Sequence, residues 1–154
     1  MGSFSFKSSG VTKVDAIANA LPAALPVIGI LTPLALGTTD IVVTSTNLAD
    51  QLTDNLRNLI LTNWGERLGF YDFGANLRPL TANLVSQDDF DSSAITAIRT
   101  AVGRWMPYID LVDFTSTTLR SQVSSVAIIQ LTITFNIPSL NVKGRALQVS
   151  LFAI

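Results

Sequence analysis

Residues 62–80 read TNWGERLGFYDFGANLRPL and separate two stretches with helical periodicity. Glycine recurs in this segment at Gly65, Gly69 and Gly74. Glycine adopts positive φ angles that other residues reach only at a steric cost, so these positions favour tight turns. The adjacent Glu66 and Arg67 are suited to bracing such turns as a charged structural pair. The sequence therefore predicts a turn-rich connection between two helices.

The helix before this connection is predicted from apolar residues that recur every three or four positions. Asn47 is the expected N-cap, Asp50 lies in the positive first turn, and Gly65 marks the expected stop. The residues predicted to face the core are Leu48, Leu52, Leu56, Leu59 and Ile60.

Two further helices are predicted after the connection. A short one spans residues 76–85 and is expected to be interrupted near Pro79. A long one begins at an acidic cluster and ends before Pro107, and its expected core face carries Ile95, Ile98, Val102 and Trp105. The cluster contains Asp88, Asp89 and Asp91; a helix start accounts for three carboxylates here better than a cation site does.

The C-terminal third has the period-two pattern of β-strands. In residues 124–137, apolar side chains alternate with polar ones from Ala127 to Ile137. The same alternation returns in a last strand over residues 146–154, after a connection over residues 141–145, and residues 108–118 form a less regular strand. The predicted fold is α+β: two long helices with a turn and a short helix between them, followed by an antiparallel sheet of about three strands.

Composition limits the possible functions. The 154 residues are 48% hydrophobic and only 14% charged, with a net charge of −1. So few charges favour a subunit of an assembly over a free monomer, and the absence of a basic field argues against nucleic-acid binding. The sequence contains no cysteine and no histidine, which excludes thiolate metal sites, Cys–His and Ser–His–Asp catalysis. No cofactor motif and no metal motif are found.

Residues 16–39 form an uncharged N-terminal segment. Its length would span a bilayer, but Pro22, Pro26 and Pro33 would leave backbone groups unpaired in lipid. The favoured interpretation is an extended apolar segment buried against partner subunits; a loop-rich part of the chain's own core and a membrane-associated segment are the alternatives. Residues 1–47 are thus predicted as an arm and residues 48–154 as the domain.

One enzymatic alternative is a lysozyme-like hydrolase. Glu66 is the only glutamate, and Asp72 follows across a glycine-containing turn, so the two carboxyls could flank a glycosidic bond. A general acid needs a raised pKa, however, whereas the neighbouring Arg67 is expected to lower that of Glu66. This reading is therefore disfavoured.

The order GER at residues 65–67, FG at residues 73–74 and a Leu-rich turn resembles the sheath-initiator family of contractile phage-tail baseplates and related injection systems, which often carries a lysozyme label. The resemblance covers residues 48–154. That family typically has a Trp-Glu-Pro-Arg run where the second long helix meets the first strand, and residues 105–108 read WMPY here. The motif residues that the resemblance links to structural or wedge contacts are Gly65, Glu66, Arg67, Phe73, Gly74, Trp105, Met106, Pro107 and Tyr108.

The resemblance implies a structural, non-enzymatic protein located in the virion, at a tail baseplate assembled in the host cytoplasm. The implied partners are the tail sheath protein, the baseplate wedge proteins, and inner-tube or tube-initiator proteins, with about six copies of this chain per tail. Sheath arms would add strands to the C-terminal sheet, a mode in which main-chain pairing supplies affinity and alternating side chains fix register. The residues expected to take part are Ile129, Leu131, Thr132, Ile133, Leu147, Gln148, Val149 and Leu151.

Overall fold

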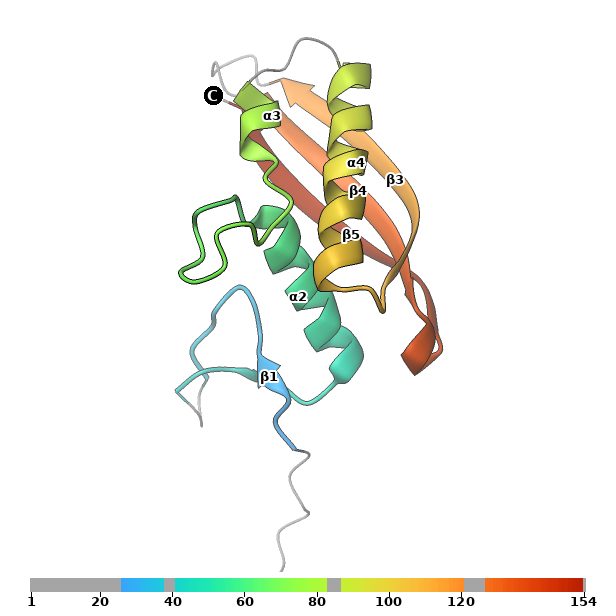
Figure 1. Ribbon diagram of the computed structural model, residues 1–154. Helices are drawn as coiled ribbons and strands as arrows, with labels where there is room; N and C mark the ends of the chain where they lie inside the picture. Colours follow the sequence, from blue (N-terminus) through green and yellow to red (C-terminus); the bar gives the residue numbers. More distant parts are fainter. Residues whose placement is uncertain (1–25, 38–40, 83–86, 121–126, 154) are drawn as a thin grey trace, which may run out of the picture.

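The computed structural model describes residues 26–37, 41–82, 87–120 and 127–153 (Figure 1). Its elements, in chain order, are β1 (Gly29–Ile30), β2 (Thr44–Ser45), α2 (Leu48–Leu61), α3 (Arg78–Ala82), α4 (Gln87–Trp105), β3 (Asp110–Arg120), β4 (Ala127–Ile137), the 3₁₀ turn η1 (Pro138–Leu140) and β5 (Val142–Ala153).

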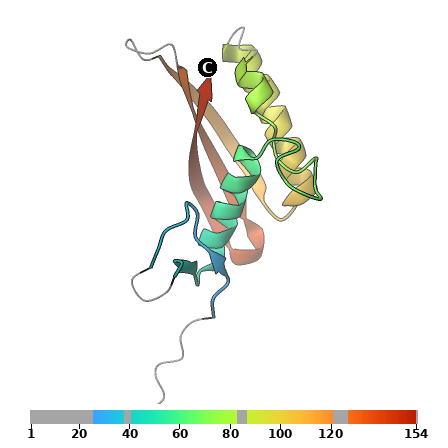
Figure 2. The ribbon, with the colours of Figure 1, turned by 90° about the vertical axis from the view of Figure 1, so that its left-hand side faces the viewer.

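The main body has two layers. Strands β3, β4 and β5 form one antiparallel sheet in that order, with β4 in the middle. Helices α2, α3 and α4 cover one face of this sheet and leave the opposite face open, as Figure 2 shows edge-on. The α+β fold predicted from the sequence is confirmed.

The core lies between the sheet and the helices. Every second residue of β4 points into it, from Ile129 to Ile137, and these five side chains are at most 1% exposed. Leu147 and Val149 of β5 lie beside Ile133 and Leu131 in the register and are buried with them. The alternation read from the sequence therefore identifies the buried face of the sheet correctly.

The connection between β4 and β5 lies earlier than predicted. The chain reverses over Pro138–Asn141, where Asn141 takes the left-handed conformation with φ 54° and its N–H bonds the Pro138 carbonyl. Strand β5 already begins at Val142, and Arg145 pairs with Phe135. Residues 141–145 were expected to be the connection because Gly144 and the charged residues beside it suggest a turn. Instead, the Gly144 N–H donates to Asn136 Oδ1, which keeps that glycine in the hairpin.

Helix α2 has the predicted start. The Asn47 side chain accepts a hydrogen bond from the Ala49 N–H, and Leu56, Leu59 and Ile60 are almost fully buried. The helix ends at Leu61, with Thr62 as its C-cap, rather than at Gly65.

Pro79 does not interrupt a helix, contrary to the prediction. Helix α3 begins at Arg78, immediately before this proline. Proline is tolerated in the first helical turn because the N–H that it lacks has no partner within the helix there. Asn76, at φ 51°, turns the chain just before α3.

Helix α4 begins at Gln87, beside the acidic cluster, and ends at Trp105, two residues before Pro107. Its buried face contains Ala94, Ile98 and Val102, with Ile95 and Trp105 half-buried. The prediction of this helix is confirmed, and Phe90 is a core residue that the apolar pattern had not included.

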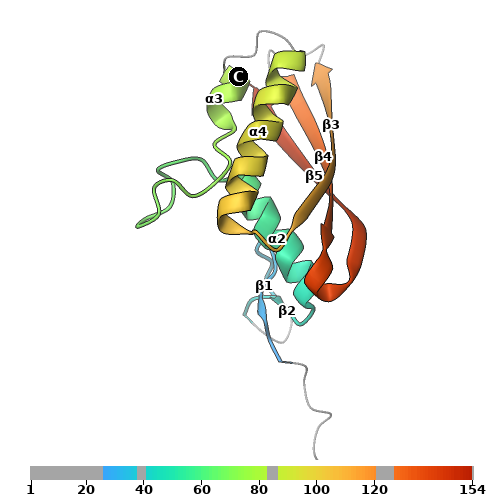
Figure 3. The same cartoon turned by 45° about the vertical axis from the view of Figure 1, so that its right-hand side comes forward.

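The segment before α2 packs against that helix through polar groups. Strands β1 and β2 form a two-residue antiparallel ribbon (Figure 3). The Thr32 N–H donates to Asp54 Oδ2 at 3.1 Å, and Arg57 donates to the Thr32 carbonyl at 3.0 Å. Within the described residues, no helix is both long enough and apolar enough to cross a membrane. Of the predicted N-terminal arm, residues 1–25 and 38–40 lie outside the described residues.

Candidate interaction sites

The connection between α2 and α3 has the predicted positive-φ turns. Gly65, Gly69 and Gly74 have φ angles of 86°, 82° and 113°. The Gly65 N–H bonds the Tyr71 carbonyl at 2.7 Å, which closes the loop on itself. A Cβ atom on Gly74 would lie 2.1 Å from the Thr62 carbonyl oxygen, so only glycine fits there.

Glu66 and Arg67 do not pair with each other, which corrects the predicted charged pair. Both carboxylate oxygens of Glu66 accept hydrogen bonds from Asn63, one from the N–H at 2.8 Å and one from Nδ2 at 3.0 Å. These two bonds and the nearby Arg78 lower the pKa of Glu66, chiefly through the Asn63 backbone N–H. The direction of the pKa shift agrees with the prediction, but its cause does not.

Arg67 instead lies over aromatic rings. Its guanidinium carbon is 4.3 Å from the ring centroid of Phe73 and 5.6 Å from that of Phe70. Both rings in turn meet Trp105 edge-to-face, with centroid separations of 5.2 Å for Phe73 and 5.8 Å for Phe70. Such stacking fixes a cation without neutralising it. The loop is thereby fastened to the C-terminal end of α4.

This stacking brings together two motifs that are far apart in the sequence. A cavity of about 590 Å³ lies between the loop, α2 and the end of α4 with the residues that follow it. Of the residues expected to make wedge contacts, those that line it are Glu66, Arg67, Phe73, Trp105, Met106 and Tyr108. Met106 is buried, whereas Tyr108 is 43% exposed at the cavity mouth. Gly65 and Gly74 shape the loop backbone, and Pro107 lies outside this cavity.

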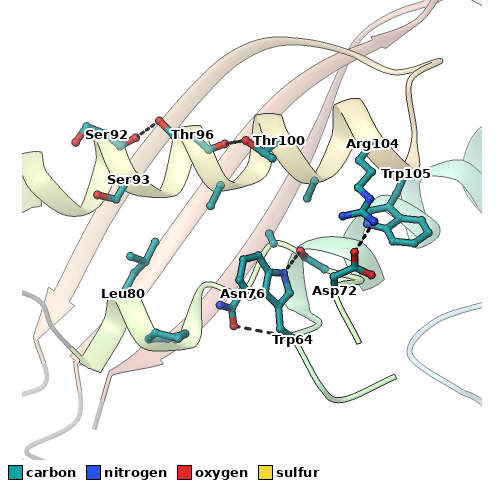
Figure 4. A pocket seen from close by; sticks show the side chains of 15 residues that line it. Trp64, Asp72, Asn76, Leu80, Ser92, Ser93, Thr96, Thr100, Arg104 and Trp105 are labelled. Atoms are coloured by element: carbon teal, nitrogen blue, oxygen red, sulfur yellow. Dashed lines mark hydrogen bonds and ion pairs between the residues drawn. The ribbon is translucent and has the colours of Figure 1, made fainter. Parts of the chain in front are cut away.

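The two carboxyls of the hydrolase alternative have different partners. Asp72 forms an ion pair with Arg104 of α4, whereas Glu66 is bonded to Asn63 (Figure 4 shows the Asp72 pair). A glycosidase acid needs a raised pKa, and that of Glu66 is lowered. The geometry therefore gives no support to glycoside hydrolysis at this pair. Among the described residues, no group of three acidic side chains is placed to hold a metal ion.

The predicted strand-addition residues divide between two different strands. Ile129, Leu131, Thr132 and Ile133 belong to β4, which has a neighbouring strand on each side and so has no free edge. Those of β5 lie on an edge strand: Leu147, Gln148, Val149 and Leu151. Any added strand must therefore pair with β5 or β3.

Two exposed apolar regions were not among the predicted site residues. The loop carries Trp64, Leu68, Phe70 and Tyr71 at 51–90% exposure. Beside it, a groove of about 600 Å³ lies between α4 and the segment from Trp64 to Leu80 (Figure 4). The sequence pattern that corresponds to this groove is a row of small residues on α4. Ser92, Thr96 and Thr100 recur there every four residues, with alanines between them.

Comparison with known proteins gives a likeness in structure only. No family model matches the sequence, and no curated protein matches it. Among solved structures, a chain of the six-fold symmetrised cryo-EM structure of the anti-feeding prophage baseplate matches with a TM-score of 0.57. The match has 18% identity and covers 70% of this chain and 82% of that one.

A protein described as a tail lysozyme from Geobacter sulfurreducens also matches, with a TM-score of 0.51 and 18% identity. Here 69% of this chain and 89% of the other are covered. The chain shares its fold with these tail proteins. The resemblance inferred from the GER and FG motifs is thus confirmed at the level of fold, and the lysozyme label recurs with it.

Proposed function

We propose that this chain is a structural component of a contractile-tail baseplate and that it nucleates the sheath by strand addition. The observation that carries the proposal is the fold that it shares with a baseplate chain, combined with a sheet that ends in an edge strand. No catalytic role is proposed.

Strand β5 is the edge best suited to receive another strand. From Ala146 to Phe152 it carries no charged residue, and its outer edge has no partner strand among the described residues. Proteins usually protect such edges with charges, prolines or bulges. Both edge strands have charges and a register shift near their starts: Asp110 and Asp113 in β3, Lys143 and Arg145 in β5. The uncharged run that follows is longer in β5, over residues 146–153, than in β3, where it covers residues 114–119 and ends at Arg120.

The helical side is proposed to face the wedge and inner-tube or tube-initiator proteins. The connection between α2 and α3, which carries the GER motif, is called the GER loop. The cavity lined by this loop and by residues 105–108 would be one contact there, with Tyr108 and Glu66 exposed. The six-fold symmetry of the similar baseplate supports about six copies per tail. The proposed location is the tail baseplate of a virion or related particle.

Co-expression with the neighbouring sheath and wedge proteins, followed by size-exclusion chromatography and electron microscopy, tests the proposal. We expect ring or tail-end particles that contain the chain. A stable monomer that binds neither protein would contradict both the location and the function.

Substitutions on β5 test the mode of contact. Gln148→Pro and the double variant Gln148→Lys/Ser150→Lys should reduce sheath recruitment, whereas Gln148→Ala should not. Far-UV circular dichroism verifies that the helices persist. If the proline disturbs the sheet itself, the lysine variant still tests the edge. Normal sheath recruitment by the folded lysine variant would rule out β5 as the receiving edge.

A further inference from the structure

Arg67 is a cation without an acidic partner among the described residues. The three ion pairs found there involve other arginines. The carboxylate of the adjacent Glu66 is bonded to Asn63, and the cation that acts on it is Arg78. The Arg67 guanidinium lies over the Phe73 ring and forms no hydrogen bond or ion pair with a described residue. Its charge is therefore available to a group from outside the chain.

The stacking also holds Arg67 in place before anything binds. The Phe70 and Phe73 rings beneath the guanidinium are themselves packed edge-to-face on Trp105 at the end of α4. A long side chain that is already ordered loses less conformational entropy when it pairs with a ligand. The planar guanidinium presents a fork of N–H donors that matches both oxygens of a carboxylate.

The neutral polar groups around the same cavity of about 590 Å³ can donate as well. Asn55 uses its Oδ1 to accept from Gln51 Nε2 at 3.1 Å, which leaves the amide N–H groups of Asn55 for another acceptor. The Asn58 amide and the Tyr108 hydroxyl line the cavity and form no side-chain hydrogen bond with a described residue. An ionised carboxylate only accepts hydrogen bonds, so it can use these donors together with Arg67.

The site suits a single carboxylate better than a polyanion or a flat ring. Arg67 and Glu66 are the only charged residues that line the cavity, so it offers one cation and no basic field for nucleic acid. Its two aromatic rings, those of Phe73 and Trp105, already contact each other, and each carries a guanidinium over its ring. A base would bind chiefly by stacking on such rings.

The surface around the cavity indicates that the carboxylate belongs to a protein. In the GER loop, Leu68 and Tyr71 beside Arg67 are 90% and 67% exposed, and Tyr108 on the opposite wall is 43% exposed. Aromatic residues and arginine are enriched at protein interfaces, and exposed apolar side chains on both sides of a cation give a partner surface to pack against.

We propose that this cavity receives an acidic side chain of a partner baseplate subunit, whose carboxylate pairs with the Arg67 guanidinium. The inference rests on the proposed function and names the chemistry of one contact on the helical side. Asn58 and Tyr108 donate to the same carboxylate, and the exposed apolar residues of the GER loop pack around it.

Removing the charge tests the contact. With a purified wedge protein, we expect Arg67→Gln to bind at least about tenfold more weakly, the scale of losing one partner of an interfacial ion pair. Arg99→Gln is the matched control: Arg99 is also exposed and forms no ion pair with a described residue, but it lies between α4 and β3. Equal binding by both variants would overturn the Arg67 contact and leave the baseplate role intact. Failure of the unmodified chain to bind any baseplate protein would instead reject the proposed function.

A second variant tests the sign of the ligand's charge without altering the stacked rings. Asn58→Asp places a carboxylate in the cavity at an exposed position of α2. It should weaken wedge binding more than Asn58→Ala does, and more at low salt than at high salt, because it repels an incoming carboxylate. Thermal unfolding verifies that each variant is folded. Binding of Asn58→Asp that equals or exceeds that of Asn58→Ala would overturn the acidic ligand.

Charge exchange identifies the partner residue. Exposed acidic residues of the wedge protein are replaced by arginine one at a time, and each variant is tested against the unmodified chain and Arg67→Glu. We expect one wedge variant to bind Arg67→Glu at least about tenfold more tightly than it binds the unmodified chain, which is the coupling of a direct charge pair. The absence of such a pair in every baseplate protein that binds, or a pair only with a second copy of this chain, would overturn the proposal.

Discussion

Strand β4 and the N-terminal segment, residues 26–37 and 41–45, are both rich in aliphatic residues but differ in how far they bury them. In β4 the apolar side chains from Ile129 to Ile137 meet the chain's own helices and are at most 1% exposed. In the N-terminal segment, six aliphatic side chains remain 44–86% exposed, whereas Leu31, Val42 and Val43 are half-buried. The six exposed residues are Val27, Ile28, Ile30, Leu34, Leu36 and Ile41.

What holds each region in place also differs. The sheet is held by burial, whereas the N-terminal segment is held to α2 by the Thr32 bonds to Asp54 and Arg57. These polar contacts hold the segment while six of its aliphatic side chains stay exposed. Exposed apolar surface of this kind marks sites of interaction with other molecules. The comparison thus separates apolar residues that are buried in the chain's own core from apolar residues that the chain itself leaves exposed.

The largest expected effect tests this separation directly. Phe135→Ala should lower the free energy of unfolding by about 3–5 kcal/mol, because it leaves a cavity in the core. Leu36→Ala, at an 81% exposed position, should change it by less than about 0.5 kcal/mol. Urea denaturation followed by circular dichroism measures both. Similar losses for the two variants would remove the distinction between the regions.

The next effect sharpens the comparison within the GER loop. Gly74→Ala forces φ 113° on a residue with a side chain and places Cβ against the Thr62 carbonyl. The φ angle alone should cost about 1–3 kcal/mol, and the clash adds to it.

Gly65→Ala is the matched control, because its φ is also positive but no atom lies within 4 Å of the added Cβ. Thermal unfolding should show the smaller loss for Gly65→Ala. If the two losses were equal, the close packing of Gly74 against Thr62 would be without energetic consequence.

A smaller effect concerns the anchor of the N-terminal segment. Asp54 is buried, accepts from the Thr32 N–H and pairs with Arg57. Asp54→Ala should lower the free energy of opening this segment by about 1–2 kcal/mol, while the core stays folded. Hydrogen exchange of residues 26–37 measures the opening. Asp54→Asn keeps an acceptor for the Thr32 N–H, so its loss of protection should be smaller. Equal protection in the unmodified chain, Asp54→Ala and Asp54→Asn would argue against this anchor.

The smallest effect is the pH dependence of Glu66. Its pKa is lowered in the folded chain, so its contribution to stability is present above the ordinary pKa of glutamate and is lost as pH falls through the folded value. NMR titration of the carboxyl group should therefore give a midpoint below that of a free glutamate. Asn63→Ala removes the side-chain bond and should raise the midpoint. An unchanged midpoint in Asn63→Ala would show that the amide does not contribute.

The sequence predicted much of the fold because its signals are local. The cap at Asn47, the helical period of α2 and α4 and the alternation in β4 each depend on residues within a few positions of one another. The glycines of the GER loop are a similar case, since positive φ is a property of single residues. Pro79 and the β4–β5 turn were misplaced because proline and glycine each suit more than one local structure.

The partners of side chains and strands were decided by the tertiary structure. Alternation shows which face of a strand is buried, but it does not show which strand lies in the middle of a sheet. Residues of the central strand, such as Thr132, were therefore expected to take part in strand addition. Adjacent charges suggested a Glu66–Arg67 pair, yet Asn63 and the rings of Phe70 and Phe73 are their neighbours in space. The groove between α4 and the segment from Trp64 to Leu80 likewise forms only where two segments meet. Periodicity fixes the conformation of each segment, whereas edges, cavities and ion pairs arise only when segments distant in the sequence pack together.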